Sequence, residues 1–271
     1  MVSPLDIEHL EVQTAVLREV YFTVGPIEVE QIQSGSDSLI IGLWDGLPSD
    51  ERQLLQQAAP RLYESMRVTA GYPNNANTCF RAITILPDEP IEGHAIGEGS
   101  LVVEARLEEL SGALFRWWTG NTYQAAPDAG WLDEGFTAYY QARLLQKSGL
   151  WTQAQFDTEV HGYQQQLWPD GTPVPLHLVQ TSVHLARTGD AADRSELQYG
   201  GALLAYQLDL ALQTQGSSLD PLWAALKDHS GPVTTQAFLD IIQTLGGSEL
   251  RSAAQAVLFG QAAPTIQTDA K

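Results

Sequence analysis

The chain has 271 residues, 44% of them hydrophobic, which is enough to bury the core of one large domain or of two subdomains. Its formal net charge is −19, from 33 acidic and 14 basic residues, and the basic residues form no cluster. Nucleic acid and anionic membrane surfaces are therefore excluded as expected partners, because both are bound through clustered lysine and arginine.

The N-terminal segment lacks the basic start and apolar centre of a signal peptide and carries Asp6, Glu8 and Glu11 instead. No apolar stretch reaches the ~20 residues of a membrane-spanning helix. We therefore expect a soluble protein and favour a cytoplasmic location. Cys79 is the only cysteine, so no disulfide can form within the chain, and its apolar neighbours predict a buried, unreactive thiol.

The first part of the chain predicts a β-rich region with one helix. The helix extends over residues 49–68, where apolar side chains recur at helical period, with Ser49 as its cap. Gly71 and the polar residues after it end the helix. Runs of β-branched and aromatic residues predict strands at 18–46, which includes the runs 21–24 and 39–44, and at 78–86 and 99–103.

From residue 105 onward the hydrophobic period is helical almost throughout. A segment containing proline and glycine, residues 169–193, predicts a connection with a short apolar piece at 175–186. The predicted helices are 105–119, 131–148, 153–167, 194–214, 218–228, 234–244 and 247–258.

Strands followed by helices predict an α+β protein. We expect three parts: a β-rich N-terminal subdomain with one helix over residues 1–104, a helical subdomain over 105–261, and a flexible polar tail over 262–271.

Residues 131–140 read Trp-Leu-Asp-Glu-Gly-Phe-Thr-Ala-Tyr-Tyr. This motif resembles the third-ligand helix of the gluzincin metallopeptidases, which include aminopeptidase N and the glycyl aminopeptidases. In these enzymes its glutamate completes a zinc site with two histidines of an H-E-x-x-H motif on the preceding helix. The resemblance gives the ligand position to Glu134. It also implies a thermolysin-like catalytic domain, in which an N-terminal mixed sheet is followed by a mostly helical half.

The aminopeptidase N pattern has eighteen residues between the second histidine and the glutamate. The same spacing places the two histidine positions at Ser111 and Phe115 and the general base at Gly112. The chain thus keeps the third ligand and lacks the other two and the base. Glu109 could lean toward the same groove, but an acidic first helical turn explains Glu108 and Glu109 better.

Two further stretches support the resemblance. Residues 116–121, Arg-Trp-Trp-Thr-Gly-Asn, are similar to the Gln-Trp-Phe-Gly-Asn that follows the second histidine, with one residue added. Residues 201–209 resemble the Tyr-x-Lys-Gly-Ala-Leu helix, whose tyrosine hydrogen-bonds the tetrahedral intermediate. That tyrosine position falls on Gln198, with Tyr199 one step later, and either register stays open.

The resemblance also implies a peptide cleft. In the family a strand and a glycine-rich segment before the zinc helix line it, and residues 91–100 hold that place here. Glycines there let a ligand backbone approach closely, and they serve turns equally well. The candidate cleft residues are Gly93, His94, Gly97, Arg116, Trp117 and Trp118.

Other metal sites are not expected from the histidines. None forms an i,i+4 pair, and His177 and His184 would lie ~10 Å apart on one helix. Without a cation, Glu134 needs a hydrogen-bond donor, because an unpaired buried carboxylate is costly. The candidate donors are Arg116, Tyr123, Tyr139 and Tyr199, whereas Asp133 is expected to face away.

These observations favour a catalytically inactive relative of the zinc aminopeptidases that binds a peptide or protein in its cleft and carries neither zinc nor another cofactor. Phe115 is then expected to fill the vacated pocket, with Trp117 or Trp118 nearby. One alternative is an active hydrolase, either a metallopeptidase with displaced ligands around Glu134 or a metal-free enzyme that uses Glu134 with Asp133. Another is a structural domain of a larger assembly.

Overall fold

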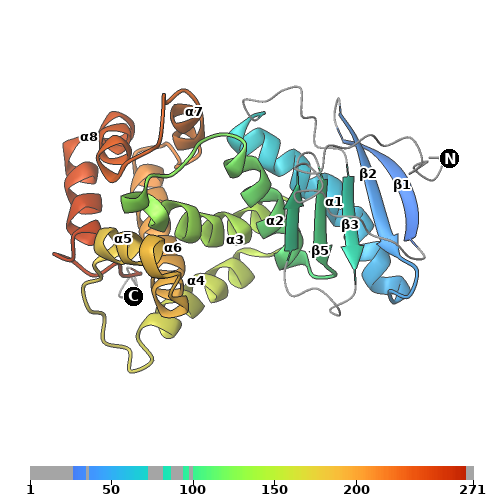
Figure 1. Cartoon of the computed structure of the whole chain (residues 1–271), viewed down its shortest axis with the longest axis horizontal. Coiled ribbons are helices and arrows are strands. Elements are labelled where there is room, and N and C mark those ends of the chain that lie inside the picture. Colours follow the sequence, from blue (N-terminus) through green and yellow to red (C-terminus); the bar gives the residue numbers. More distant parts are fainter. Residues whose placement is uncertain (1–26, 35–36, 73–81, 87–93, 98–99, 267–271) are drawn as a thin grey trace.

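The computed structural model of the chain describes residues 27–34, 37–72, 82–86, 94–97 and 100–266. A five-stranded sheet lies at one end of the molecule, and helices make up the rest (Figure 1). The predicted α+β class, with an N-terminal mixed sheet and a helical second half, is confirmed. The predicted strand at 21–24 and the predicted environment of Cys79 lie outside the described residues.

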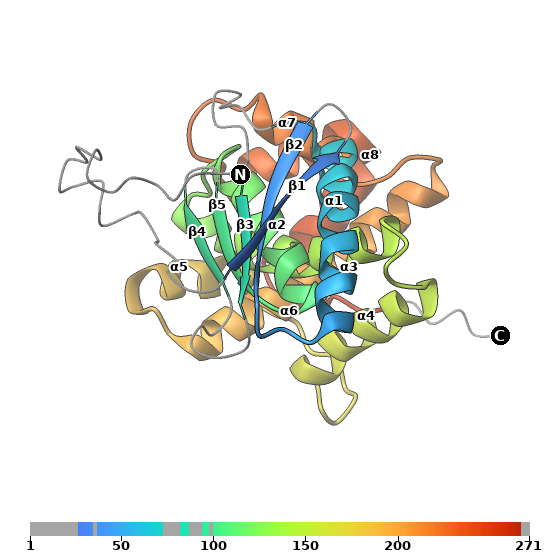
Figure 2. The same cartoon turned by 90° about the vertical axis from the view of Figure 1, so that its right-hand side faces the viewer.

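The sheet has the strand order β1-β2-β3-β5-β4. β1 is antiparallel to β2, β4 is antiparallel to β5, and the two central pairings, β2 with β3 and β3 with β5, are parallel. The strands are β1 (Ile27–Ser34), β2 (Asp37–Trp44), β3 (Ala82–Leu86), β4 (His94–Gly97) and β5 (Ser100–Glu104). Figure 2 shows the strands with α1 beside them.

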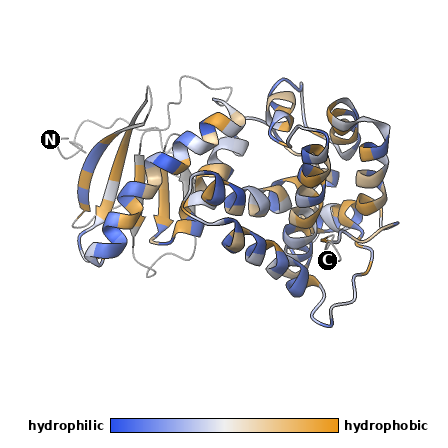
Figure 3. Ribbon diagram, turned by 180° about the vertical axis from the view of Figure 1, so that it is seen from behind, coloured by the Kyte–Doolittle hydropathy of each residue, from blue (hydrophilic) through white to orange (hydrophobic). Residues whose placement is uncertain are grey.

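One face of this sheet is buried under helices α1 (Ser49–Ala70) and α2 (Leu107–Gly120). Alternate residues of β2, such as Leu39, Ile41 and Leu43, are completely buried, as the period of two in a strand requires. In Figure 3 the inner strands are largely hydrophobic, whereas the outer strand β1 and the helices mix hydrophobic and hydrophilic positions. Helix α2 therefore packs against both the sheet and α1.

Helix α1 begins and ends close to the predicted residues. Gly71 follows its last residue with φ of 74°, a conformation that glycine adopts at little cost. The expected cap is wrong: Ser49 is the first helical residue, and Pro48 precedes it without a side-chain cap.

The helical half follows the predicted order with two differences. The predicted helices 234–244 and 247–258 correspond to the two segments of α8, which meet at a kink at Gly247, whose φ of 83° is not helical. Helix α5 lies in the segment predicted as a connection. Predicted helix 131–148 begins as a π-helical turn, η4. The elements are η3 (Pro127–Ala129), η4 (Leu132–Phe136), α3 (Thr137–Lys147), α4 (Gln153–Leu167), α5 (Leu178–Thr188), α6 (Ala191–Thr214), α7 (Pro221–Lys227) and α8 (Thr235–Leu258).

The end of the described chain packs against the helices. Ala262, Ala263 and Ile266 contact the core, and Gln207 Nε2 donates a hydrogen bond to the carbonyl of Thr265 at 2.7 Å. Residues 262–266 therefore differ from the predicted flexible tail, because their small apolar side chains find a surface to cover. Among the described helices, none combines the length and the apolar character needed to cross a bilayer.

Candidate functional site

The site is organised around Glu134, which lies in the π-helical turn η4 between α2 and α6. This turn packs backbone to backbone against α6. A Cβ atom on Gly135 would lie 2.3 Å from the Cα atom of Gly201, and one on Gly201 would lie 2.6 Å from the carbonyl oxygen of Trp131. Such contact is possible only between glycines, so the two glycines fix where Glu134 sits relative to α6.

Two arginines hold the carboxylate of Glu134. Arg116 Nη2 on α2 donates a hydrogen bond to Oε2 at 3.1 Å, and Arg194 Nε on α6 lies 3.4 Å from Oε1. The side chain of Glu134 is 16% exposed, against 36% for Arg116 and 58% for Arg194. Arg116 is the partner that the sequence predicts. Arg194 was missed, although it precedes Gly201 by seven residues and so shares its helix face.

Asp133 belongs to the same cluster and does not face away from it as expected. Tyr123 donates a hydrogen bond to Asp133 Oδ1 at 2.8 Å. Desolvation by the surrounding atoms raises the pKa of Asp133, although the residue is exposed at the surface, and the charge of Glu134 raises it further. The Tyr123 hydrogen bond and the charge of Arg116 act in the opposite direction.

The three tyrosines proposed as donors to Glu134 have other partners. The Tyr123 hydroxyl bonds Asp133, and Tyr139 donates to Asp209 Oδ2 at 2.5 Å. The ring of Tyr199 stacks on that of Tyr163, with centroids 5.9 Å apart. Tyr199 therefore packs toward α4, and the neighbouring Gln198 is half-buried on α6.

Phe115 is completely buried, as the sequence predicts. Its ring stacks on Tyr140 of α3 at 4.9 Å and 7°, and meets Trp223 of α7 edge to face at 4.9 Å and 80°. Trp117 and Trp118 are also buried, at 1% and 0% exposure. These two tryptophans are thus core residues, and the prediction that they line an open cleft is wrong.

Ser111 and Gly112 face α3 beside Gln141. Ser111 Oγ donates a hydrogen bond to the Gln141 carbonyl at 2.8 Å, and a Cβ atom on Gly112 would lie 2.8 Å from Gln141 Oε1. Gln141 is two helical turns beyond Glu134, ~10 Å along the axis. The packing of α2 against α3 is therefore as predicted. The expected meeting of Ser111 and Phe115 with Glu134 is not observed, and Arg116 is the residue of α2 that reaches the carboxylate.

The predicted cleft segment forms an edge of the described sheet. β4 pairs only with β5 there, with His94 opposite Val103 and Gly97 opposite Ser100. Gly93 lies outside the described residues. The two histidines that were considered as a metal-binding pair have other neighbours. His184 contacts Asp193, and the ring of His177 fills the space that a Cβ atom on Gly260 would need.

The residues at this site do not fit a zinc ion, which needs three or four nitrogen, sulfur or oxygen donors. The carboxylate of Glu134 is already held by two cations. The Ser111 hydroxyl is committed to a backbone carbonyl, and Phe115 has no lone pair to donate. In the part of the chain that the structure describes, no three histidine, cysteine, aspartate or glutamate side chains are grouped as metal ligands.

Comparison with known proteins supplies structural relatives only. No protein-family model and no curated protein sequence matches the chain. An aminopeptidase N family protein from Idiomarina loihiensis is similar with a TM-score of 0.70 and 13% identity, covering 88% of this chain and 48% of that one. An M1 zinc metallopeptidase from Deinococcus radiodurans, bound to a Tyr-Ser-Ala substrate, gives 0.62 and 19%, covering 89% and 54%.

A third similar structure is leukotriene A4 hydrolase from Saccharomyces cerevisiae, with a TM-score of 0.63 and 14% identity, covering 88% of this chain and 40% of that one. The chain thus has the gluzincin-like aminopeptidase fold that its motif implied, and it spans about half the length of these proteins. At such identities the likeness concerns the fold alone.

Proposed function

We propose that the chain is a catalytically inactive relative of the zinc aminopeptidases, a pseudopeptidase that binds a peptide or protein segment. The observation that carries the proposal is the pairing of Glu134 with Arg116 and Arg194. Two guanidinium groups face the two oxygens of the carboxylate that the motif resemblance assigns to a zinc ligand. A guanidinium group is not a Lewis acid, so it does not activate a water molecule as a nucleophile in the way that a bound metal ion does.

The surrounding positions support the same conclusion. Peptide hydrolysis needs a base that takes a proton from water, and Gly112 has no side chain to do so. Glu134 cannot serve as that base while both its oxygens face arginines. Asp133 accepts a hydrogen bond from Tyr123, which positions the carboxylate but supplies no second catalytic group.

Binding of a peptide is supported by the fold and by the sheet. One solved structure with this fold contains a Tyr-Ser-Ala substrate. In the described sheet β4 is an edge strand, and an extended peptide can add to such an edge through main-chain hydrogen bonds. The chain therefore retains a surface for peptides even where it lacks the groups that would cleave them.

The test begins with protein purified without added zinc or chelator. We expect no stoichiometric zinc by elemental analysis and no chelator-sensitive turnover of aminoacyl or peptide substrates above background. We also expect saturable binding of short peptides by calorimetry. The isosteric variant Glu134→Gln is the control for any metal that is found.

Two outcomes would overturn the proposal. Nearly one zinc per chain, lost in Glu134→Gln, together with chelator-sensitive turnover, would identify an active metallopeptidase with displaced ligands. Absence of both activity and peptide binding would favour a structural domain of a larger assembly.

A further inference from the structure

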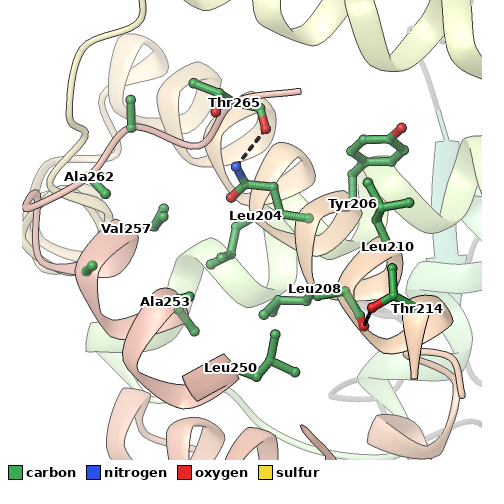
Figure 4. A pocket seen from close by; sticks show the side chains of 15 residues that line it. Leu204, Tyr206, Leu208, Leu210, Thr214, Leu250, Ala253, Val257, Ala262 and Thr265 are labelled. Atoms are coloured by element: carbon green, nitrogen blue, oxygen red, sulfur yellow. Dashed lines mark hydrogen bonds between the residues drawn. The ribbon is translucent and has the colours of Figure 1, made fainter. Parts of the chain in front are cut away.

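A second candidate site lies between the last three turns of α6 and the second half of α8. A cavity of about 430 Å³ is formed there and is bordered on a third side by residues 262–265 (Figure 4). The residues that line the cavity include none of those in the Glu134 cluster, which are Glu134, Asp133, Tyr123, Arg116 and Arg194. The two sites are therefore separate.

The bend of α8 at Gly247 creates this cavity. Gly247 has φ of 83°, which breaks the helix direction, and the following segment runs beside α6. Leu250, Ala253 and Val257 from that segment face Leu204 and Leu208 of α6 (Figure 4). The alanines leave space that larger side chains would fill, so the two helices do not close on one another.

The walls of the cavity suit an aliphatic occupant. None of the 15 lining residues is charged, and Tyr206 is the only aromatic one among them. Two of the polar side chains are already bonded, since Gln207 donates to the Thr265 carbonyl and Thr214 to the Ala211 carbonyl. Water in contact with such walls is displaced favourably by a hydrocarbon chain, whereas a charge would find no partner.

The volume favours a small molecule over a protein helix. Sites for small ligands usually measure ~300–1,000 Å³. A helix about 10 Å across has a volume of about 420 Å³ per turn, so this cavity would take a single turn. At about 30 Å³ for each water-sized group, the same space holds a chain of roughly ten to fourteen carbon atoms.

We propose that the cavity between α6, α8 and residues 262–265 binds an unbranched aliphatic chain with an uncharged head group. The contact between Gln207 and Thr265 holds the terminal segment against one side of the cavity. The net charge of −19 adds to this preference, because it disfavours an anionic amphiphile near the surface. This inference is independent of what Glu134 does.

The test is calorimetric titration of the complete 271-residue chain with 1-decanol and 1-hexanol. We expect saturable binding of 1-decanol and at least tenfold weaker binding of 1-hexanol, because the shorter chain buries less apolar surface. Ala253→Trp fills the cavity from an exposed position and is expected to weaken 1-decanol binding at least tenfold. Ser252→Trp, one residue earlier and outside the lining, is the matched control and should change it less than twofold.

Thr214→Trp, at an exposed lining position on α6, repeats the test if Ala253→Trp does not fold. No binding of 1-decanol would overturn the proposal, as would affinity that ignores chain length or survives both tryptophans. Sedimentation of the same proteins tests the other possible occupant, a second copy of the chain. Self-association that is abolished by Ala253→Trp and unaffected by 1-decanol would show that a second copy of the chain covers this surface.

Discussion

Glu134 Oε2 and Arg116 Nη2 lie 3.1 Å apart, which joins the turn that carries the family-like glutamate to the helix where the zinc-binding histidines are missing. On the proposed function, this contact gives the carboxylate a cation from the chain in place of a metal. We expect this pair to couple by about 0.5–1 kcal/mol in a double-mutant cycle of Arg116→Ala and Glu134→Ala, because Arg116 is 36% exposed and water screens it. Urea unfolding of the four proteins measures the coupling.

The same cycle with Arg194→Ala should give a smaller coupling, because Arg194 is 58% exposed. Equal or larger coupling for Arg194 would mean that α6, and not α2, provides the main partner of the carboxylate.

Phe115 fills the core position where the resemblance places a zinc ligand. Its ring touches Tyr140 and Trp223 and is not exposed at all, so Phe115→Ala should lower the free energy of unfolding by ~3–5 kcal/mol. Phe259→Ala is the matched control, since that ring is 45% exposed, and should change stability by less than about 0.5 kcal/mol. A small effect of Phe115→Ala in urea unfolding would show that this part of the core is loosely packed.

Two glycine-to-alanine substitutions should have opposite effects on stability, because Gly135 lies against Gly201 of α6 and Gly162 has open space beside it. Gly135→Ala places a Cβ atom 2.3 Å from the backbone of α6, so we expect it to destabilise the fold by ~1–3 kcal/mol. In Gly162→Ala, on α4, the new methyl group meets nothing within 4 Å, and the helix should gain ~0.5–1 kcal/mol. Thermal unfolding of both variants checks the prediction, and a tolerated Gly135→Ala would contradict the observed backbone contact.

Asp133 should make stability depend on pH. Its pKa in the folded chain lies above the ordinary value of 3.8, first because of desolvation and then because of Glu134. An acid that is weaker in the folded state contributes stability that is fully present below pH 3.8 and is lost as the pH rises through the raised pKa. Asp133→Asn keeps an acceptor for Tyr123 and removes this loss, so its stability relative to the wild type should rise with pH and then level off.

Tyr123→Phe is the companion variant in that experiment. It removes a hydrogen bond that lowers the pKa of Asp133, so the loss of stability with pH should become larger. Urea unfolding between about pH 4 and pH 7 measures all three proteins. A difference between Asp133→Asn and the wild type that stays constant over this range would contradict the raised pKa.

Rebuilding the zinc site tests the family relationship directly. Ser111→His, Gly112→Glu and Phe115→His restore the motif, but Arg116 would still hold Glu134, and the side chain of Gln141 must move to admit residue 112. Adding Arg116→Gln, the residue that the family has at this position, should therefore tighten zinc binding at least tenfold over the triple variant. Calorimetry with zinc measures both, and Glu134→Ala in the same background should abolish binding. A quadruple variant that folds normally and binds no zinc would mean that the geometry itself has been lost.

The sequence predicted the helices well where one apolar face is buried. Helix α4, with the predicted bounds 153–167, is the clearest case, because it has a capping box at Thr152 and the periodic core residues Phe156, Val160 and Tyr163. Helix α5 was missed because few of its residues, among them Leu178 and Ser182, are buried. The apolar face of α5 is so narrow that its sequence pattern cannot be distinguished from that of a loop after proline and glycine residues.

The candidate site was predictable in its residues but less so in its contacts. The motif at residues 131–140 located Glu134, and Arg116 was one of the four candidate donors that the sequence offered for its carboxylate. The π-helical turn shifts the helical period by one residue, and periodicity cannot reveal such a shift in advance. Whether Tyr123 would bond Asp133 or Glu134 depended on that shift, and so did the direction in which Asp133 points.

Two ion pairs of the chain's own side chains connect α2 and α6 to Glu134 in η4. A protein bridged by a metal must acquire that metal after synthesis, and its folded population then follows the metal supply of its compartment. Here the bridging cations are encoded in the polypeptide and arrive with the chain itself. If the chain binds no metal, as we propose, folding of this region needs no loading step, and the strength of the two ion pairs falls as ionic strength rises.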